Sequence, residues 1–205
     1  GTLYFSGSAK GQQPLRTTKA HSLPFIVKTT IDKDSICSNH FVVVTTSKRF
    51  RYRNGISRRG DAVLFGYDGE TKYIYGRSKE DTVTVKCNAG EGLQKIKITV
   101  RGSMVIFEDS SCPPLMAPYP IENRRLPLYT MLGANRMNNL EHNCNVKGAS
   151  YFNSFEILGR KPVAGLTGSD EGVLLSDDFN FRMKADPNMW ELTNKTLFNG
   201  RVDKD

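Results

Sequence analysis

The sequence predicts an all-β fold, an antiparallel β-sandwich of the jelly-roll or immunoglobulin-like kind. From residue 21 to residue 112, short runs of β-branched and aromatic residues recur about every ten residues, which is typical of sandwiches and barrels. Asn-Gly at 54–55 and Asp-Gly at 68–69 lie between such runs and favour tight hairpin turns. The chain of 205 residues is long enough to bury a sizeable core.

Residues 1–20 are rich in Gly, Ser, Thr, Gln and Lys, so we expect a flexible N-terminal arm with a weak strand at 3–5. Residues 21–112 are expected to form a basic β-sandwich domain. Its strands are predicted at 25–27, 41–46, 49–53, 62–65, 71–75, 82–87, 95–101 and 104–107. The run 95–101 alternates without a fault, which places Ile96, Ile98 and Val100 inside and Lys95, Lys97 and Arg101 outside.

Five of the nine prolines lie between residues 113 and 127. Because each proline removes a backbone donor, this segment is excluded from central strands and forms either a linker or a crossing over one sandwich. Residues 128–205 are then a second β-rich domain or the completing half of the same sandwich. Strands are expected at 152–158 and 173–183, and short helices at 128–140 and 186–192, the latter from Asp-Pro at a helix start.

The four cysteines, Cys37, Cys87, Cys112 and Cys144, are even in number and widely spaced. They do not form the two close ligand pairs of a zinc site, so we expect no metal and two disulfides of open connectivity. Disulfides indicate a secreted or extracellular-surface protein, and the sequon at Asn194 fits a glycoprotein. No apolar run approaches the roughly 18–20 residues that a membrane span needs.

The net charge of +8 is unevenly distributed. Residues 1–101 hold 18 Lys and Arg against 8 Asp and Glu, whereas residues 102–205 hold 11 against 13. A basic half joined to a slightly acidic half indicates that one end of the molecule faces a polyanion or an anionic surface.

Cationic residues are densest at 48–59, where they make up six of twelve positions. In a strand, Arg49, Arg51 and Arg53 would share one face and two aromatic residues the other. The predicted anion-binding set is this ladder with its neighbours and the outward residues of 95–101: Arg49, Arg51, Arg53, Arg58, Arg59, Lys95, Lys97 and Arg101. Two alternatives are edge-strand protection by the arginines and stacking of single-stranded nucleic acid on the aromatics.

Catalytic patterns are missing from the sequence: there is no GxSxG, no HExxH and no phosphate-binding GxxxxGK[ST]. We therefore expect no enzyme and no cofactor. Acidic pairs at 32/34, 170/171 and 177/178 are weak calcium candidates that match no known loop pattern. Trp190 is read as a core residue, with stacking on a sugar ring as the alternative.

These observations predict a secreted or surface binding and adhesion protein that recognises a polyanionic glycan, such as heparin, or an anionic protein surface. The alternative is a structural assembly subunit, such as a viral coat, spike or filament protein, whose N-terminal arm pairs with a neighbouring subunit. A homo-oligomer fits either hypothesis, and nucleic acid is expected as a partner only for a viral coat.

Overall fold

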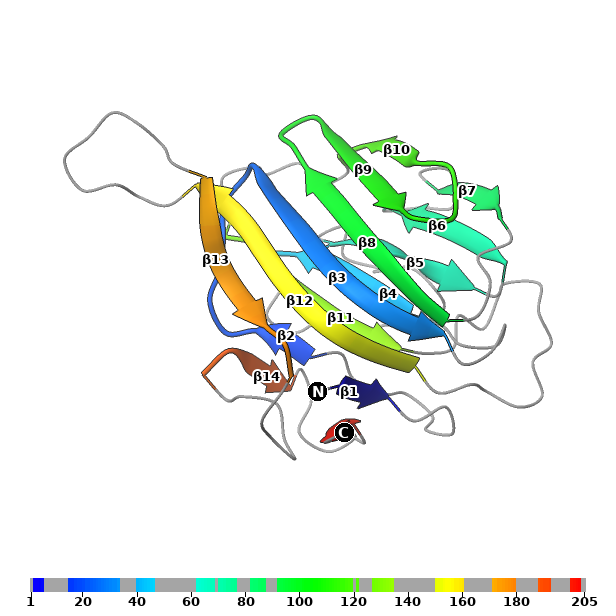
Figure 1. Ribbon diagram of the computed structural model, residues 1–205. Coiled ribbons are helices and arrows are strands. Elements are labelled where there is room, and N and C mark those ends of the chain that lie inside the picture. Colours follow the sequence, from blue (N-terminus) through cyan, green and yellow to red (C-terminus); the bar gives the residue numbers. More distant parts are fainter. Residues whose placement is uncertain are drawn as a thin grey trace.

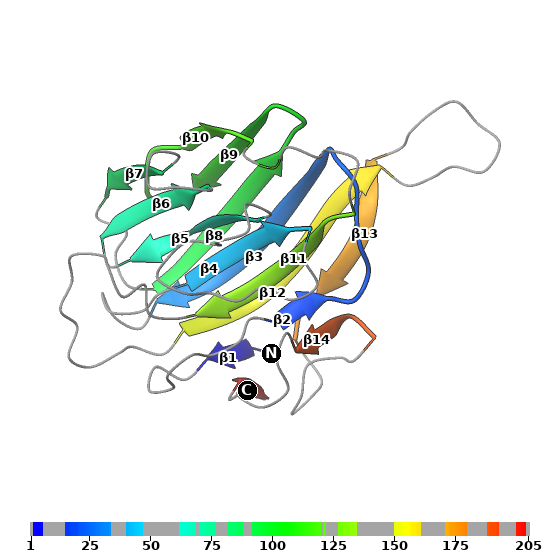
Figure 2. The ribbon, with the colours of Figure 1, turned by 180° about the vertical axis from the view of Figure 1, so that it is seen from behind.

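The computed structural model is a sandwich of two antiparallel β-sheets, which confirms the predicted fold class (Figures 1 and 2). The structure describes residues 2–5, 15–33, 40–46, 62–68, 70–76, 82–87, 92–119, 121, 127–134, 150–160, 171–179, 188–192 and 200–203. None of the described segments forms a helix long and apolar enough to cross a membrane.

Sheet A has eight strands. Their order is β10 (Leu115–Pro118), β9 (Met104–Asp109), β8 (Gly92–Val100), β3 (Phe25–Lys33), β12 (Ser150–Arg160), β1 (Thr2–Phe5) and β15 (Gly200–Asp203), and β13 (Glu171–Asp177) also pairs with β12. β1 pairs with residues 150–152 of β12, and β13 pairs with residues 155–160 of β12. β1 and β13 therefore lie one after the other along β12.

Sheet B has seven strands. Their order is β14 (Trp190–Leu192), β2 (Leu15–Thr17), β11 (Tyr129–Ala134), β4 (His40–Thr45), β5 (Ala62–Asp68), β6 (Thr71–Tyr75) and β7 (Val83–Lys86). Both sheets therefore combine strands from the two halves of the sequence, and residues after 128 complete the sandwich that residues 21–112 begin.

The main core lies between the two sheets. Phe107 of β9 shows this contact, because its ring centroid is 6.0 Å from that of Phe65 and 5.5 Å from that of Tyr67, both on β5. A second cluster occupies the other face of sheet B and includes Phe41, Val43, Leu64 and Met131. β4 is thus buried on both faces, which explains why its sequence is a continuous apolar run rather than an alternating one.

The described parts of the N-terminal segment contain the strand expected at 3–5 but differ from the flexible arm that the composition predicts for the rest. Two of its parts are strands of the sandwich, β1 in sheet A and β2 in sheet B. Leu3 and Leu15 are fully buried there, so apolar burial and strand pairing hold a segment that is otherwise polar. Both strands pair within their own chain.

The proline-rich segment contributes one strand, β10, at the edge of sheet A. A proline in an edge strand can direct its nitrogen to solvent, so no hydrogen bond to the neighbouring strand is lost. The edge position of β10 therefore agrees with the exclusion of this segment from central strands. After β10 the chain crosses from sheet A to β11 of sheet B.

Both predicted helices are wrong over the residues that the structure describes. Residues 129–134 form β11 in the centre of sheet B, and residues 190–192 form β14 after a turn. Trp190 is in register with Thr17, and its ring packs against those of Phe155 and Phe179. Tertiary pairing and burial therefore override the local helix-start signal, and the reading of Trp190 as a core residue is confirmed by its 3% exposure.

Candidate binding groove on sheet A

A groove of about 420 Å³ lies on sheet A and crosses β8, β3, β12 and β13. Side chains on the outer face of these strands line the groove. They are Lys95 and Lys97 from β8, Lys28 and Thr30 from β3, Ser154 and Glu156 from β12, Ser176 from β13, and Asp178 just after β13. Volumes of this size are typical of sites for small ligands.

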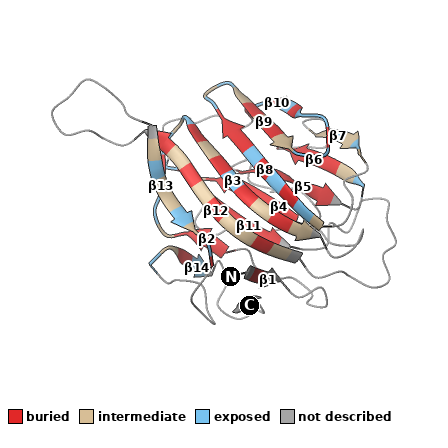
Figure 3. Cartoon of the chain, in the orientation of Figure 1, coloured by how far each residue is buried: buried red, intermediate tan, exposed pale blue. Residues whose placement is uncertain are grey.

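Exposed and buried residues alternate along β8 from Leu93 to Ile98, which places its lysines on the outer face, as the sequence predicts, and so in the groove. Ile96, Ile98 and Val100 are 5%, 0% and 0% exposed, while Lys95 and Lys97 are exposed. Figure 3 shows the buried and exposed parts of β8. Side chains on one face of a strand recur about every 6.5–7 Å, so the two ammonium groups follow one another along the groove.

β3 brings a third lysine to the same place. Lys28 of β3 is directly opposite Lys97 of β8, and Thr30 is directly opposite Lys95. Opposed side chains on one face have Cβ atoms about 4.5–5.5 Å apart, and like charges in this position repel each other. The sheet thus holds three cationic side chains in a cluster whose mutual repulsion a bound anion would relieve.

Two glutamates flank this cluster and form ion pairs with two of its three lysines. Glu108 of β9 lies 2.9 Å from the Nζ atom of Lys97, and Glu156 lies 3.8 Å from that of Lys28. All four side chains are between a third and a half exposed, so solvent screens both ion pairs and each stabilises the fold by at most about 1 kcal/mol. Lys95 has no ion-pair partner among the residues that the structure describes.

Hydroxyl groups occupy the middle of the groove. The Ser154 hydroxyl donates to the Thr30 hydroxyl across 3.1 Å, and the Thr29 hydroxyl donates to the Ser154 carbonyl across 2.6 Å. These bonds hold β12 where its register against β3 shifts between Phe152 and Ser154. Beyond Lys28 and Glu156, the next pair on the outer face is Ile26 opposite Leu158. The polar lining of the groove ends at this apolar pair.

Of the predicted anion-binding residues, the structure brings Lys95 and Lys97 together in the groove. Arg101 is exposed but lies beyond the end of β8, where its backbone N–H donates to the Met104 carbonyl in a turn. The arginine ladder at Arg49, Arg51 and Arg53, with Arg58 and Arg59, lies outside the described residues, and so does Asn194.

Sequence reasoning missed Lys28, Ser154, Glu156 and Ser176. Lys28 stands on an outward position of β3, and period-two alternation is a signal that could have found it. The β12 and β13 residues had no such signal, because their place beside Lys28 depends on pairing between residues more than a hundred positions apart in the chain.

One of the two expected disulfides is present, between Cys87 and Cys112, and Cys37 and Cys144 lie outside the described residues. The bond links the end of β7 in sheet B to the loop after β9 in sheet A. A β-sandwich with a disulfide is consistent with an extracellular location.

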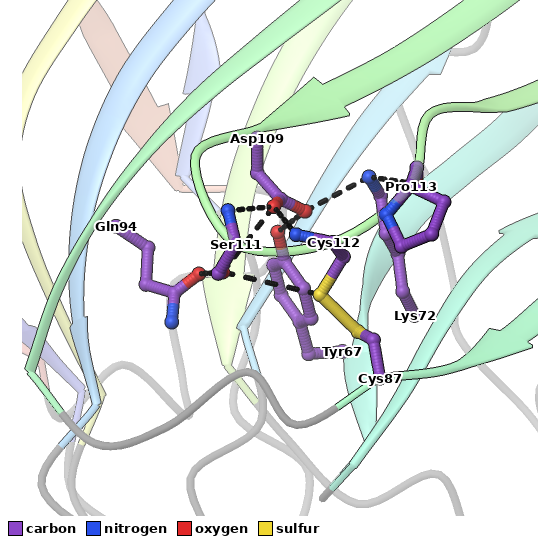
Figure 4. Close-up of polar contacts among 8 residues, drawn as sticks. All are labelled: Tyr67, Lys72, Cys87, Gln94, Asp109, Ser111, Cys112 and Pro113. Atoms are coloured by element: carbon purple, nitrogen blue, oxygen red, sulfur yellow. Dashed lines mark hydrogen bonds and ion pairs between the residues drawn. A yellow bond between two sulfur atoms is a disulfide. The ribbon is translucent and has the colours of Figure 1, made fainter.

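A second polar cluster beside this disulfide is buried (Figure 4). The Lys72 ammonium lies 2.8 Å from the Asp109 carboxylate and donates to the Pro113 carbonyl at 3.0 Å, while the Tyr67 hydroxyl donates to Asp109 at 2.6 Å. Backbone N–H groups of Ser111 and Cys112 donate to the other carboxylate oxygen. The Lys72 and Asp109 side chains have no exposed area, so we assign this cluster to the fold rather than to a ligand.

The pKa values of this cluster reflect its burial. Burial alone would raise the pKa of Asp109, but hydrogen bonds from Lys72, Tyr67 and the two backbone N–H groups together lower it below its ordinary value. Burial, with the hydrogen bond to Asp109 and its negative charge, raises the pKa of Tyr67. Asp109 is therefore a carboxylate, and Tyr67 keeps its proton to donate.

The described histidines are also buried. His21 lies 2.9 Å from the Thr130 hydroxyl, and burial lowers the pKa of His21 from 6.5 to about 4. Thr130 is fully buried, so this hydroxyl–imidazole contact is closed to a substrate. His40 lies between the sheets, with its Nε2 atom 3.0 Å from the backbone N of Tyr151.

Two of the calcium candidates, Asp34 and Asp170, lie outside the described residues, and those that are described form no metal site. Asp177 accepts hydrogen bonds from the Trp190 indole at 2.7 Å and from the Phe179 backbone at 2.8 Å, which commits both of its oxygens to the fold. Within the described part of the chain, no group of three or more His, Cys, Asp or Glu side chains is arranged to hold a metal ion.

A scan against protein-family models finds no match, and no curated protein matches the sequence. Among solved structures, an uncharacterised protein from Mycobacterium paratuberculosis is similar with a TM-score of 0.48 and 6% identity, covering 76% of this chain and 80% of that one. Domains LG4–5 of the mouse laminin α1 chain give 0.46 and 10%, covering 85% of this chain and 47% of that one. Sheep galectin-11, in complex with glycerol, gives 0.42 and 9%, covering 62% and 92%. Likeness at this level assigns no function to the chain.

Proposed function

We propose that this chain is a secreted or surface binding module that holds an acidic glycan in the groove of sheet A. The observation that carries the proposal is the opposed pair of Lys28 and Lys97, with Lys95 beside them, in a groove that also offers hydroxyl groups. A sulfate or carboxylate placed among three ammonium groups would relieve their repulsion and form charge-assisted hydrogen bonds.

The rest of the groove suits a sugar better than a simple anion. Thr30, Ser154 and Ser176 supply hydroxyl groups that donate and accept, and Glu156 supplies a strong acceptor for sugar hydroxyls. The basic segment at 48–59 remains part of the proposal as a second contact for a long polyanion such as heparin, and cell adhesion through such glycans is the biological role that we propose.

The proposed role involves binding without chemistry. An oligosaccharide that has been incubated with the protein should be recovered intact, as checked by mass spectrometry. Shortened products that disappear with Glu156→Gln would contradict this part of the proposal and indicate a hydrolase.

Retention on a heparin column across a salt gradient tests the proposal. The test variant, Lys28→Ser with Lys95→Ser, removes two groove charges, and the control variant, Lys19→Ser with Arg101→Ser, removes two exposed charges elsewhere. We expect the test variant to elute at much lower salt and its log–log salt dependence of binding to fall by about two. The control should elute near the unmodified protein.

If the elution salt concentration falls equally in the two variants, binding depends only on net charge, and this result would refute a site in the groove. A third variant, in which Arg49, Arg51 and Arg53 are all changed to Ser, separates the two basic surfaces. If it alone abolishes retention, the binding site is the 48–59 segment and not the groove.

A further inference from the structure

The charges that line the groove are divided between its strands, and the two signs meet where Glu156 of β12 lies directly opposite Lys28 of β3. All of its lysines come from β8 and β3, and the acidic side chains on its outer face, Glu156 and Asp178, come from β12 and the residue after β13. No lysine or arginine lines the groove from β12 or β13, and no acid lines it from β8 or β3, among the described residues.

The distance between the two ends is that of a short oligosaccharide. Neighbouring strands lie about 4.8 Å apart, so the groove runs about 14 Å from β8 across β3 and β12 to β13. β8 and β12 are two strand spacings, about 10 Å, apart, so an acidic group over Lys95 and Lys97 lies away from Glu156, and the two sides of the groove face different parts of one ligand.

We propose that this separation orients the glycan and selects its charge pattern, an inference that rests on the proposed function. The ligand carries its acidic group on the sugar over Lys28, Lys95 and Lys97. The sugar over Glu156 and Ser176 is neutral and donates its hydroxyl groups to the carboxylate. A glycan with an acid on every sugar would place a negative charge against Glu156, so alternating acidic and neutral sugars fit the groove better.

Glu156 and Glu108 provide a matched pair of variants. Each forms an ion pair with a groove lysine, Glu156 with Lys28 and Glu108 with Lys97. Glu156 also lines the groove, whereas Glu108 does not. Changing either residue to Gln frees one lysine, but only Glu156→Gln alters the acidic end.

The experiment measures the affinity of two probes by calorimetry at low ionic strength, in the full chain carrying Arg49→Ser, Arg51→Ser and Arg53→Ser. One probe is a heparin tetrasaccharide, which has acidic groups on every sugar, and the other is a hyaluronan tetrasaccharide, which has a carboxylate on every second sugar. Glu156→Gln should strengthen heparin binding about 1.5- to 5-fold and weaken hyaluronan binding about as much, as expected for exposed charges. Glu108→Gln should weaken neither probe.

Opposite shifts of the two probes in Glu156→Gln support the inference. Shifts in the same direction, as in Glu108→Gln, or no shift at all, would overturn it, because Glu156 would then act only through Lys28. Binding of heparin without hyaluronan would overturn it as well. If neither probe binds the starting chain, the proposed function itself fails.

Discussion

The buried ion pair between Lys72 and Asp109 allows a sharp test of what holds the two sheets together at this edge. Changing Lys72 to Met keeps most of the side-chain volume but removes the ammonium group. The Asp109 carboxylate then stays buried without its counter-charge, and the Pro113 carbonyl loses a donor. Breaking a fully buried pair in this way costs about 3–5 kcal/mol of unfolding free energy.

The exposed pair between Lys97 and Glu108 serves as the internal control. Its N–O distance of 2.9 Å nearly equals the 2.8 Å of the buried pair, but its side chains are 46% and 41% exposed rather than 0%. Lys97→Met should therefore cost at most about 1 kcal/mol. The two pairs have nearly the same pairing distance, so the comparison contrasts a buried pair, which also donates to the Pro113 carbonyl, with an exposed one.

Urea denaturation monitored by fluorescence measures both variants, and the pH dependence adds a second readout. The hydrogen bond from Lys72 is the first cause that lowers the pKa of Asp109 against the effect of burial, so without it that pKa should rise. The unmodified protein loses stability as pH falls and Asp109 takes up a proton, and the variant should lose less, so the penalty of Lys72→Met should shrink as pH falls to about 4 and below. A penalty below about 1 kcal/mol, or one independent of pH, would refute this reasoning.

Three further predictions concern stability. The pKa of His21 falls from 6.5 to about 4 on folding, so its contribution to the free energy of unfolding should be fully present above pH 6.5 and should fall by about 3 kcal/mol as pH falls to 4. Urea titrations at several pH values measure this slope, and His21→Gln should flatten it. Replacing Cys87 and Cys112 with Ser opens a loop of 25 residues and should cost about 3.5 kcal/mol, read as a lower urea midpoint; an unchanged midpoint would contradict it. Gly66→Ala should cost about 1–3 kcal/mol in thermal unfolding, because its Cβ would collide with the backbone carbonyl of His40.

Sequence periodicity determined the strands that have one polar and one apolar face. The strand at 95–101 was predicted down to the direction of Lys95 and Lys97, because alternation is a local property that survives in the folded chain. The hairpin from β5 to β6 follows in the same way from Asp-Gly between two apolar runs. The even cysteine count indicated disulfides but left the pairing open.

Local patterns failed where distant partners decide the structure. Residues 190–192 have a helix-start signal before them, yet Trp190 is held as a strand by pairing with Thr17 and by the rings around it. The polar N-terminal segment became two strands because Leu3 and Leu15 find buried places in sheets formed by the rest of the chain.

The sequence by itself therefore determined the fold class, the basic character of the first half and the outward lysines of β8. Only the tertiary structure decided that Lys28 stands opposite Lys97, and that Glu156 lies beside them from more than a hundred residues away. Register between strands depends on which apolar faces can be buried together, and this is a property of the whole sandwich rather than of any one segment. The groove, and the charge separation across it, are consequences of that register.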